Sequence, residues 1–305
     1  QVPNMVFPSA DLSTSDKSDG FLKKTHAFTK GDFSGAFFQA GVAELTMACC
    51  CIGMALHGGV IPACGTFFVF SDYMKPAVRM AALMELPVKF IWTHDAFRVG
   101  EDGPTHEPVE QEAQIRLMEK LKNHHGKPSV LVLRPADAQE TTEAWKLAME
   151  NMSTPTALIF SRQGIANLPE GNDYSLAAKG GYIVGGSDEN PDIILVATGS
   201  EVSTLVAGAE LLRKEGVKVR IVSVPSEGLF RLQSKEYQLS VLPHDVKKFG
   251  LTAGLPVNLL GLVPEAEGNI WGLESFGFSA PYKVLDEKLG YTSENVYKQV
   301  KAILG

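Results

Sequence analysis

The residues with the clearest chemical potential lie in the segment Gly100-Glu101-Asp102-Gly103-Pro104-Thr105-His106. Two glycines and a proline disfavour a continuous helix or strand, so we expect a loop, called the acidic loop below, that presents Asp102 and His106. His94 follows an apolar run shortly before it, and Arg162 follows a later one. Because histidines titrate near neutral pH, carboxylates orient them and arginines bind anions, this set suits proton transfer on polyhydroxylated, phosphorylated substrates. The alternative is a surface turn that contains His and Asp by chance.

One charged residue, Glu44, lies in the otherwise uncharged stretch from Val42 to His57. The stretch has the length of a helix and is largely apolar, so we expect a helix buried on nearly every side. A carboxylate at the start of a buried helix needs a hydrogen-bonding partner or a proton. The alternative is an acid favoured there by the helix dipole. The residues alone leave both interpretations open.

Three aromatic residues, Phe67, Phe70 and Tyr73, follow one another at intervals of three. They close a strand-like run and lead into an expected helix from Asp72 to Met84. Aromatic side chains in this position pack in the core or line a pocket for a flat heterocycle. Spacing alone favours the core.

The elements that must position these residues alternate between short apolar strands and helices. This alternation predicts an α/β fold of two doubly wound domains, each with a mainly parallel sheet flanked by helices. Ligands bind outside the carboxyl ends of the strands in such sheets. Since His94, Arg134 and Arg162 all follow strand-like runs, we expect them to face a site.

The length of 305 residues predicts two domains. A segment with Pro169 and Gly171 is the best linker candidate. We therefore expect a first domain over residues 1–165, a linker over 166–179 and a second domain over 180–305. The second domain has no cluster of acids, bases or nucleophiles. At its Gly199-Ser200 junction a plain turn is favoured over an anion site.

Composition and charge disfavour several classes of protein. The chain is 45% hydrophobic and 21% charged with a net charge of −7, so we expect no binding to nucleic acid or to a membrane. The longest uncharged apolar run, Leu45 to Leu56, is too short to cross a bilayer, and no leader opens the sequence. We expect a cytoplasmic protein. Because the first residue is Gln1, we also expect processing or a longer parent chain.

The cysteines and histidines match no known metal or nucleophile pattern. The cysteine spacing fits neither a zinc site nor a disulfide framework, so we expect buried, reduced thiols. His94, His106 and Asp102 are the one set of ligands that can converge, but no metal motif matches them, and we predict no metal ligand in this chain. Ser200 lacks a nucleophile elbow. The four cysteines are Cys49, Cys50, Cys51 and Cys64.

Several segments together closely resemble transketolase. The resemblance covers nearly the whole chain and corresponds to the pyrimidine-binding and C-terminal domains of that family. The acidic loop with the preceding Thr-His-Asp is the most specific part, because it separates transketolases from deoxyxylulose-phosphate synthases and the β chains of oxoacid dehydrogenases. The matching segments are Ser9-Ala10-Asp11-Leu12, Thr66 to Tyr73, Thr93-His94-Asp95, Gly100 to Pro108, and Ala197-Thr198-Gly199-Ser200-Glu201.

The resemblance implies thiamine diphosphate as cofactor and transfer of a two-carbon ketol unit from a ketose phosphate to an aldose phosphate. Glu44 matches the glutamate that hydrogen-bonds the aminopyrimidine and thereby helps deprotonate the thiazolium carbon. The three aromatic residues match the box around the pyrimidine ring, which reverses the preference for plain core. Asp11 and Leu12 match a loop near the cofactor. The implied cofactor-binding residues are Glu44, Phe67, Phe70, Tyr73, Asp11 and Leu12.

The resemblance also implies residues that contact the sugar phosphate. His94 and Asp102 match residues that contact substrate hydroxyl groups, and His106 matches a histidine that handles protons at the substrate oxygen. Arg162 and Ser15 match positions that hold the phosphate. The implied catalytic residues are therefore Glu44, His106 and His94.

Parts of the family pattern are absent from this sequence. Ala43 stands where the family usually has an arginine before the glutamate, Phe97 and Arg98 replace smaller residues, and Met118 to Lys127 resembles an insertion. No Gly-Asp-Gly with a following Asn, the pattern that holds Mg²⁺ (or Ca²⁺) at the diphosphate, occurs in the chain. We therefore expect the C-terminal portion of a transketolase, as a fragment or as the smaller subunit of a split enzyme.

This interpretation implies a homodimer whose active site also needs a diphosphate-binding domain or subunit. The isolated chain is then expected to be inactive. The alternatives are a noncatalytic dimerising or regulatory homologue, and another thiamine diphosphate enzyme such as a deoxyxylulose-phosphate synthase.

Overall fold

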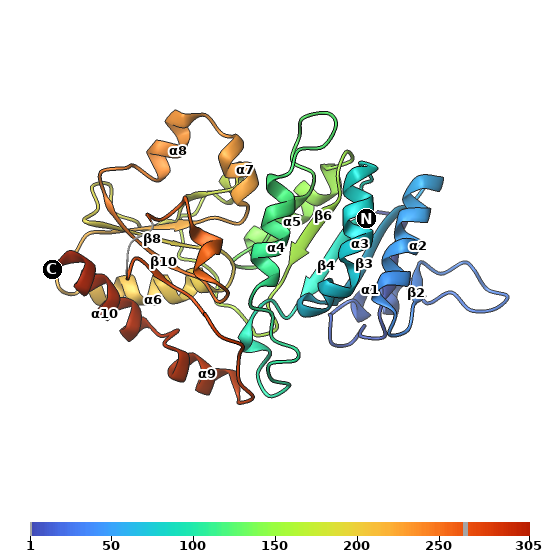
Figure 1. Ribbon diagram of the computed structural model, residues 1–305, viewed down its shortest axis with the longest axis horizontal. Coiled ribbons are helices and arrows are strands. Elements are labelled where there is room, and N and C mark those ends of the chain that lie inside the picture. Colours follow the sequence, from blue (N-terminus) through green and yellow to red (C-terminus); the bar gives the residue numbers. More distant parts are fainter. Residues whose placement is uncertain (1, 265–267) are drawn as a thin grey trace.

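The computed structural model describes residues 2–264 and 268–305, which form two α/β units side by side (Figure 1). Within the described residues, the first unit has six strands in the order β2-β1-β3-β4-β6-β5, and every pair is parallel. All its strands therefore end at the same edge of the sheet. They are β1 (Met5–Ser9), β2 (Phe37–Gln39), β3 (Ile61–Phe67), β4 (Lys89–Thr93), β5 (Leu131–Leu133) and β6 (Thr156–Ile159).

Helices cover both faces of this first sheet because its strands are apolar on both sides. Helices α2, α3 and α4 pack on the face that carries Cys64, Phe90 and Trp92. Helices α1 and α5 pack on the opposite face, which carries Phe7 and Ile91. The helices are α1 (Asp19–Thr25), α2 (Glu44–His57), α3 (Ser71–Leu83), α4 (Gln111–Lys120) and α5 (Ala138–Glu150).

The second unit contains a five-stranded sheet among the described residues, in the order β11-β10-β8-β9-β7. Only the pairing of β7 with β9 is antiparallel there. Helices α6, α9 and α10 pack on one face, and α7 and α8 on the other. The strands are β7 (Tyr182–Ile183), β8 (Ile193–Ala197), β9 (Val219–Ser223), β10 (Lys247–Leu251) and β11 (Ile270–Trp271). The helices are α6 (Glu201–Arg213), α7 (Glu227–Leu232), α8 (Lys235–Val241), α9 (Tyr282–Leu289) and α10 (Ser293–Leu304).

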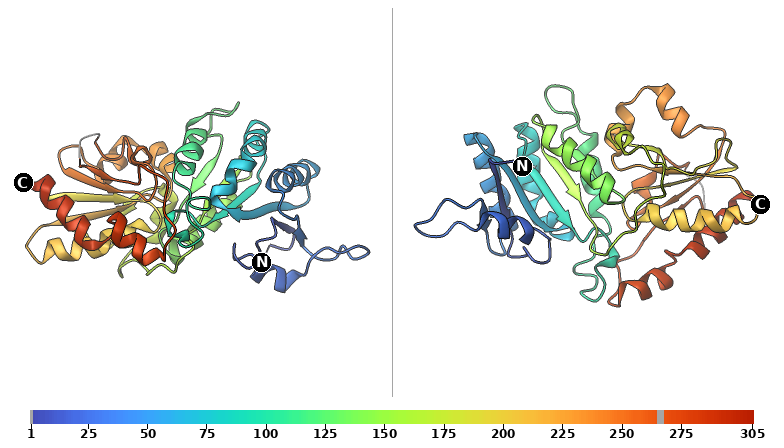
Figure 2. Two further views of the ribbon diagram at one scale, coloured as in Figure 1. Left: turned by 60° about the horizontal axis from the view of Figure 1, so that its bottom comes forward. Right: turned by 180° about the vertical axis from the view of Figure 1, so that it is seen from behind.

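These two sheets confirm the predicted α/β class with mainly parallel, helix-flanked sheets (Figure 2). In the part of the chain that the structure describes, no helix is both long enough and apolar enough to cross a bilayer.

The prediction that the helix from Val42 to His57 is buried on nearly every side is wrong. Helix α2 begins at Glu44, and only one of its faces packs on the sheet. Leu45 and Leu56 are 45% and 56% exposed. Sequence periodicity cannot tell whether an apolar helix face packs on its own chain or stays exposed, because apolar residues occur in both cases.

The expectation of four buried thiols is correspondingly half right. Cys51 and Cys64 are buried, whereas Cys49 and Cys50 are exposed on the open side of α2. A hydrogen bond between the Cys51 thiol and Cys64, together with burial, raises the pKa of Cys51 well above its usual range, so this thiol stays protonated.

The two units are joined by a buried ion network. Arg134, directly after β5, binds Asp95 of the first unit at 2.7 Å and Glu201 of the second at 2.6 Å. Arg98 binds the same Glu201 at 2.8 Å and Asp286 of α9 at 2.7 Å. Burial opposes the charge on Arg134, but the Glu201 and Asp95 carboxylates raise its pKa well above the ordinary value. The network therefore consists of charged groups paired away from water, although Oδ1 of Asp95 is buried without a hydrogen-bond partner.

We expect Arg134→Met to destabilise the chain by about 3–5 kcal/mol, because it leaves the carboxylates of Asp95 and Glu201 buried without their main partner. Urea titration monitored by circular dichroism measures the free energy of unfolding. The control is Lys301→Met, which removes a half-exposed pair with Glu215 and should leave the free energy of unfolding nearly unchanged, because solvent screens exposed pairs. Equal losses in the two variants would contradict a structural role for the network.

Candidate active site

The candidate site residues of the first unit gather at the edge where its parallel strands end. Each follows a different strand: Asp11 and Leu12 follow β1, and Glu44 opens α2 after β2. Because neighbouring parallel strands end together, the order β2-β1-β3-β4-β6 brings these segments onto one edge. At β3, Phe67 is the last strand residue and Phe70 and Tyr73 follow it. The residues after the other strands are His94, Asp102 and His106 (β4) and Arg162 (β6).

His94 has the most defined environment of the predicted residues. Its ring stacks on Phe67 with 3.6 Å between centroids and 20° between planes. The side chain is 6% exposed, and the hydroxyl of Thr93 lies 2.9 Å from its Nδ1. The residue has φ of +61°, a left-handed conformation that turns the chain sharply at the end of β4. None of the described residues forms a hydrogen bond with its other ring nitrogen, Nε2.

The electrostatic surroundings keep His94 uncharged at neutral pH. Burial is the largest cause and, with the positive charge of Arg162, lowers the pKa of His94 to about 4. The carboxylate of Asp102 acts in the opposite direction, while Lys17 and His106 lower the pKa further. The structure thus brings Arg162, Asp102 and His106 around His94. It also adds Lys17, which sequence reasoning missed because a lone lysine in a polar loop has no distinguishing spacing.

His106 also contacts the aromatic residues. Its ring meets Phe70 edge-on with 5.4 Å between centroids, and Phe67 with 6.4 Å. The Thr105 hydroxyl lies 2.9 Å from its Nδ1. The two histidines of the predicted site therefore approach Phe67 from two directions.

The aromatic residues form a stacked series. Phe67 and Phe70 are nearly parallel, with 6.0 Å between centroids and 9° between planes, and Phe70 continues to Tyr73 at 6.1 Å. Phe67 is buried, Phe70 is half-buried and Tyr73 is 62% exposed. The preference for plain core is therefore wrong for Tyr73, whose ring is free to contact another molecule.

Glu44 is 8% exposed at the first position of α2. The preceding Ala43 caps the helix without a side-chain hydrogen bond. None of the described residues forms a hydrogen bond or an ion pair with the Glu44 carboxylate. Neither oxygen of this carboxylate is among the fully buried unpartnered atoms, so the group remains accessible to a ligand.

The loop after β1 is held by Asp16. The Asp16 carboxylate accepts hydrogen bonds from the Ser9 hydroxyl at 2.7 Å and from the Ser18 backbone N–H at 2.9 Å. Asp11 and Ser15 are exposed on this loop, and Asp11 has φ of +63°. Neither residue forms a side-chain hydrogen bond to a described residue, so their predicted roles remain predictions.

Arg134 does not face the site, contrary to the prediction from its place after a strand. It is 1% exposed and lies in the ion network between the units. Strand β5 is an edge strand, and the residue after it contacts the second unit, since the Arg134 backbone N–H donates to the Pro225 carbonyl at 2.8 Å. Arg98 likewise joins that network and does not open toward the aromatic residues.

No group of three or more His, Cys, Asp or Glu side chains in residues 2–264 and 268–305 is arranged to hold a metal ion.

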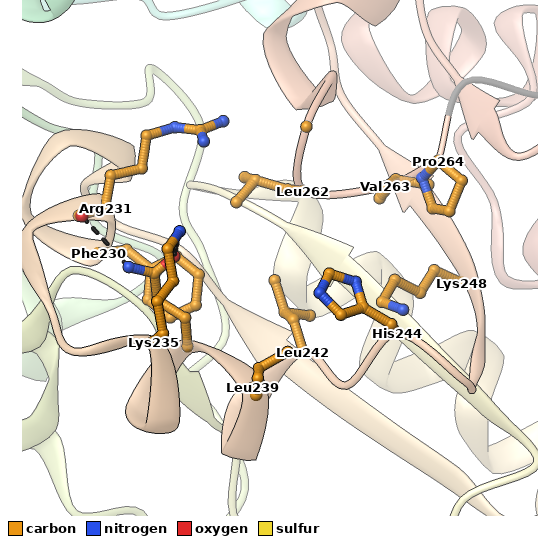
Figure 3. Close-up of a pocket in the computed structure, with 12 residues that line it drawn as sticks. Phe230, Arg231, Lys235, Leu239, Leu242, His244, Lys248, Leu262, Val263 and Pro264 are labelled. Atoms are coloured by element: carbon orange, nitrogen blue, oxygen red, sulfur yellow. Dashed lines mark hydrogen bonds between the residues drawn. The ribbon is translucent and has the colours of Figure 1, made fainter.

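A cavity of about 520 Å³ lies in the second unit, away from the candidate site residues of the first unit, with basic and apolar side chains around it (Figure 3). Its cations are already engaged: Arg231 pairs with Glu227, and Lys248 donates to the Val246 carbonyl. This cavity contains none of the predicted site residues.

Both units of the chain match known proteins of one family. Residues 1–166 match a family profile described as the transketolase pyrimidine binding domain, and residues 180–292 match one described as the transketolase-like C-terminal domain. A transketolase of Bacillus subtilis is 44% identical over 308 residues, which cover all of this chain and 44% of that protein. A transketolase of Geobacillus stearothermophilus is 42% identical, with the same coverage. The chain therefore spans less than half the length of these relatives.

Solved structures of transketolases are also similar to this chain. Transketolase from Leishmania mexicana superposes with a TM-score of 0.89 at 35% identity, covering 99% of this chain and 43% of that one. A structure described as a split gene transketolase, inactive beta4 tetramer, has a TM-score of 0.74 at 25% identity and covers 99% of this chain and 92% of that one. With 44% identity over its full length and matches to both family profiles, the chain belongs to the transketolase family.

Proposed function

We propose that this chain supplies the pyrimidine-binding side of an enzyme that transfers a two-carbon ketol unit from a ketose phosphate to an aldose phosphate. The observation that carries the proposal is the convergence of His94 and His106 on Phe67, at the strand edge where an unpartnered Glu44 begins α2. Proton transfer and recognition of hydroxyl groups both need such side chains within reach of one bound molecule.

The described residues fit thiamine diphosphate, the cofactor of the transketolase family. When bound, this cofactor supplies a nucleophilic carbon that accepts the two-carbon unit. Phe67, Phe70 and Tyr73 would pack against its flat pyrimidine ring, and Asp11 and Leu12 would lie near it. Glu44 would hold a proton at a pyrimidine nitrogen, which gives its buried carboxyl group a hydrogen-bonding partner.

On the substrate side, the uncharged imidazole of His94 would hydrogen-bond a sugar hydroxyl through Nε2. Asp102 would accept from a second hydroxyl, and His106 would exchange a proton with the substrate oxygen. Arg162 and Ser15 would hold the phosphate, and Lys17, the cation that lowers the pKa of His94, would add positive charge beside them.

We propose that the diphosphate and its Mg²⁺ (or Ca²⁺) are held by a further domain or subunit, since the relatives are more than twice as long as the stretch matched here. The parts would assemble as a homodimer in the cytoplasm. We further propose that residues 1–165 bind the pyrimidine, 166–179 form a linker, and 180–305 form the C-terminal domain.

This proposal predicts that the isolated chain has no ketol transferase activity and gains it when the diphosphate-binding half, thiamine diphosphate and Mg²⁺ are added. Coupled assays with a ketose-phosphate donor and an aldose-phosphate acceptor measure the transfer. Turnover by the chain alone would contradict the requirement for the second half. Transfer from pyruvate in place of the ketose phosphate would indicate a deoxyxylulose-phosphate synthase activity.

In the assembled enzyme, Glu44→Gln should lower kcat/KM by about 10²–10⁴, because the amide keeps the shape but cannot exchange the proton. The matched control is Glu101→Gln in the acidic loop, whose exposed side chain has no proposed role and whose loss should change kcat/KM less than about twofold. Unchanged turnover in the Glu44 variant would remove this residue from the mechanism and favour a noncatalytic homologue.

The lowered pKa of His94 predicts an acid-sensitive contribution to stability. The unfolded chain binds the proton near pH 6.5 and the folded chain near pH 4, so stability is lost as the pH falls through this window. Between pH 7 and 5, the wild type should lose about 1–2 kcal/mol more than His94→Asn. Asn tolerates the positive φ at this position.

Urea titrations of the isolated chain at the two pH values test this expectation. His124→Asn, a substitution at an exposed histidine, should keep the wild-type dependence. The same pH dependence in the wild type and in His94→Asn would show that His94 is not held uncharged by the fold.

A further inference from the structure

The acidic loop packs against a segment of the second unit, Phe276 to Pro281, called the docking segment below. The docking segment leads directly into α9, and both views in Figure 2 place this part of the chain beside the loop that follows β4. Residues of the two units that are about 180 positions apart in the sequence are therefore in direct contact there.

Ser279 is the centre of this contact. Its hydroxyl donates a hydrogen bond of 2.6 Å to the backbone carbonyl of Glu101. A Cβ atom on Gly103 would lie 3.1 Å from the Cβ of Ser279, and one on Gly100 would lie 3.3 Å from the Ala280 carbonyl oxygen. Both glycines also have positive φ, +90° at Gly100 and +76° at Gly103. The loop therefore approaches the docking segment backbone to backbone, as only glycine allows.

Glu107, directly after His106, inserts into the same contact. Its side chain is buried and lies so close over Gly277 that a Cβ atom there would collide with the carboxylate. Burial raises the pKa of Glu107 to about 7. Neither carboxylate oxygen has a hydrogen-bond partner among the described residues, so the side chain is held against the docking segment by packing over Gly277.

Arg98 fixes the other end of the loop. Its guanidinium binds Asp286 in α9, the helix that continues the docking segment, at 2.7 Å. It also packs over the rings of Phe97 and Tyr291, at 5.0 and 5.6 Å from their centroids. The acidic loop is therefore held to the second unit on both sides of Asp102 and His106.

We infer that the docking segment fixes the acidic loop in the conformation that presents Asp102 and His106, and that Ser279 and Glu107 are positioning residues for these side chains. The second unit then takes part in substrate recognition without contacting the substrate. This role for the second unit rests on the proposed function, whereas the ordering of the loop does not.

Hydrogen exchange of the chain, read by mass spectrometry, tests the ordering directly. Within the loop, the Gly103 and His106 N–H groups donate to Gly100 and Gly103 carbonyls at 3.1 and 2.9 Å. In Ser279→Ala their exchange should become about three- to tenfold faster, as expected for the loss of one hydrogen bond that closes the loop. The matched control, Ser275→Ala, changes an exposed serine beside the docking segment and should leave exchange unchanged. Wild-type exchange in Ser279→Ala would overturn the inference.

Kinetics of the assembled enzyme give the second readout. Ser279→Ala should lower kcat/KM for the sugar phosphates by about tenfold, because small displacements of substrate-contacting groups are costly. The affinity for thiamine diphosphate should change less than about twofold, since the loop is not proposed to bind the cofactor. An equal loss of cofactor affinity would indicate general unfolding and overturn the positioning role.

Glu107 is tested by a pair of substitutions. Glu107→Ala removes the contact with Gly277 and should reproduce the effects of Ser279→Ala, whereas Glu107→Gln keeps the shape and should restore wild-type exchange and turnover. Failure of Gln to restore either property would overturn the positioning role. If the wild-type assembly shows no ketol transfer, the proposed function fails, and hydrogen exchange alone then decides whether the docking segment orders the loop.

Discussion

The position of the site residues depends on the buried ion network between the two units. Arg134 binds Asp95, the residue after His94, and Arg98 lies two residues before the acidic loop. Both guanidinium groups meet at Glu201 of the second unit. Because a buried charge without its partner costs about 3–5 kcal/mol, the units cannot separate without disturbing the turns on both sides of the site. The network thereby makes the second unit part of the site's support.

Much of the fold and part of the site follow from local sequence patterns. The apolar runs give the strands of both sheets, and the rule for parallel sheets correctly places the segments after β3, β4 and β6 at one edge. The composition of the acidic loop correctly predicts an irregular segment, since Gly100 and Gly103 both adopt positive φ. The stacking of His94 on Phe67 brings together two segments that were each predicted separately to contribute residues to a site.

The features that could not be predicted depend on partners far away in the sequence. Arg134 and Arg162 both follow strands, but β5 is the edge strand beside the second unit, so Arg134 joins the ion network, whereas the charge of Arg162 acts on His94. Strand order results from pairing between distant segments, and the local periodicity of the sequence does not predict it. The same holds for Lys17, which approaches His94 only because the loop after β1 folds around Asp16. The open face of α2 has the same apolar composition as its buried face.

In the candidate site, hydrogen bonding to uncharged groups and binding of an anionic group fall to different residues, although a single histidine could do both. Burial against Phe67 keeps His94 neutral, so its imidazole can donate a hydrogen bond to an uncharged group or accept one from it. The positive charge at this edge is carried by Arg162 and Lys17, whose side chains suit an anionic group. A protonated His94 would add to these cations and compete with them for Asp102. In the proposed site, an imidazole in a desolvated position next to exposed cations would let one end of a ligand be recognised by hydrogen bonds and the other by charge.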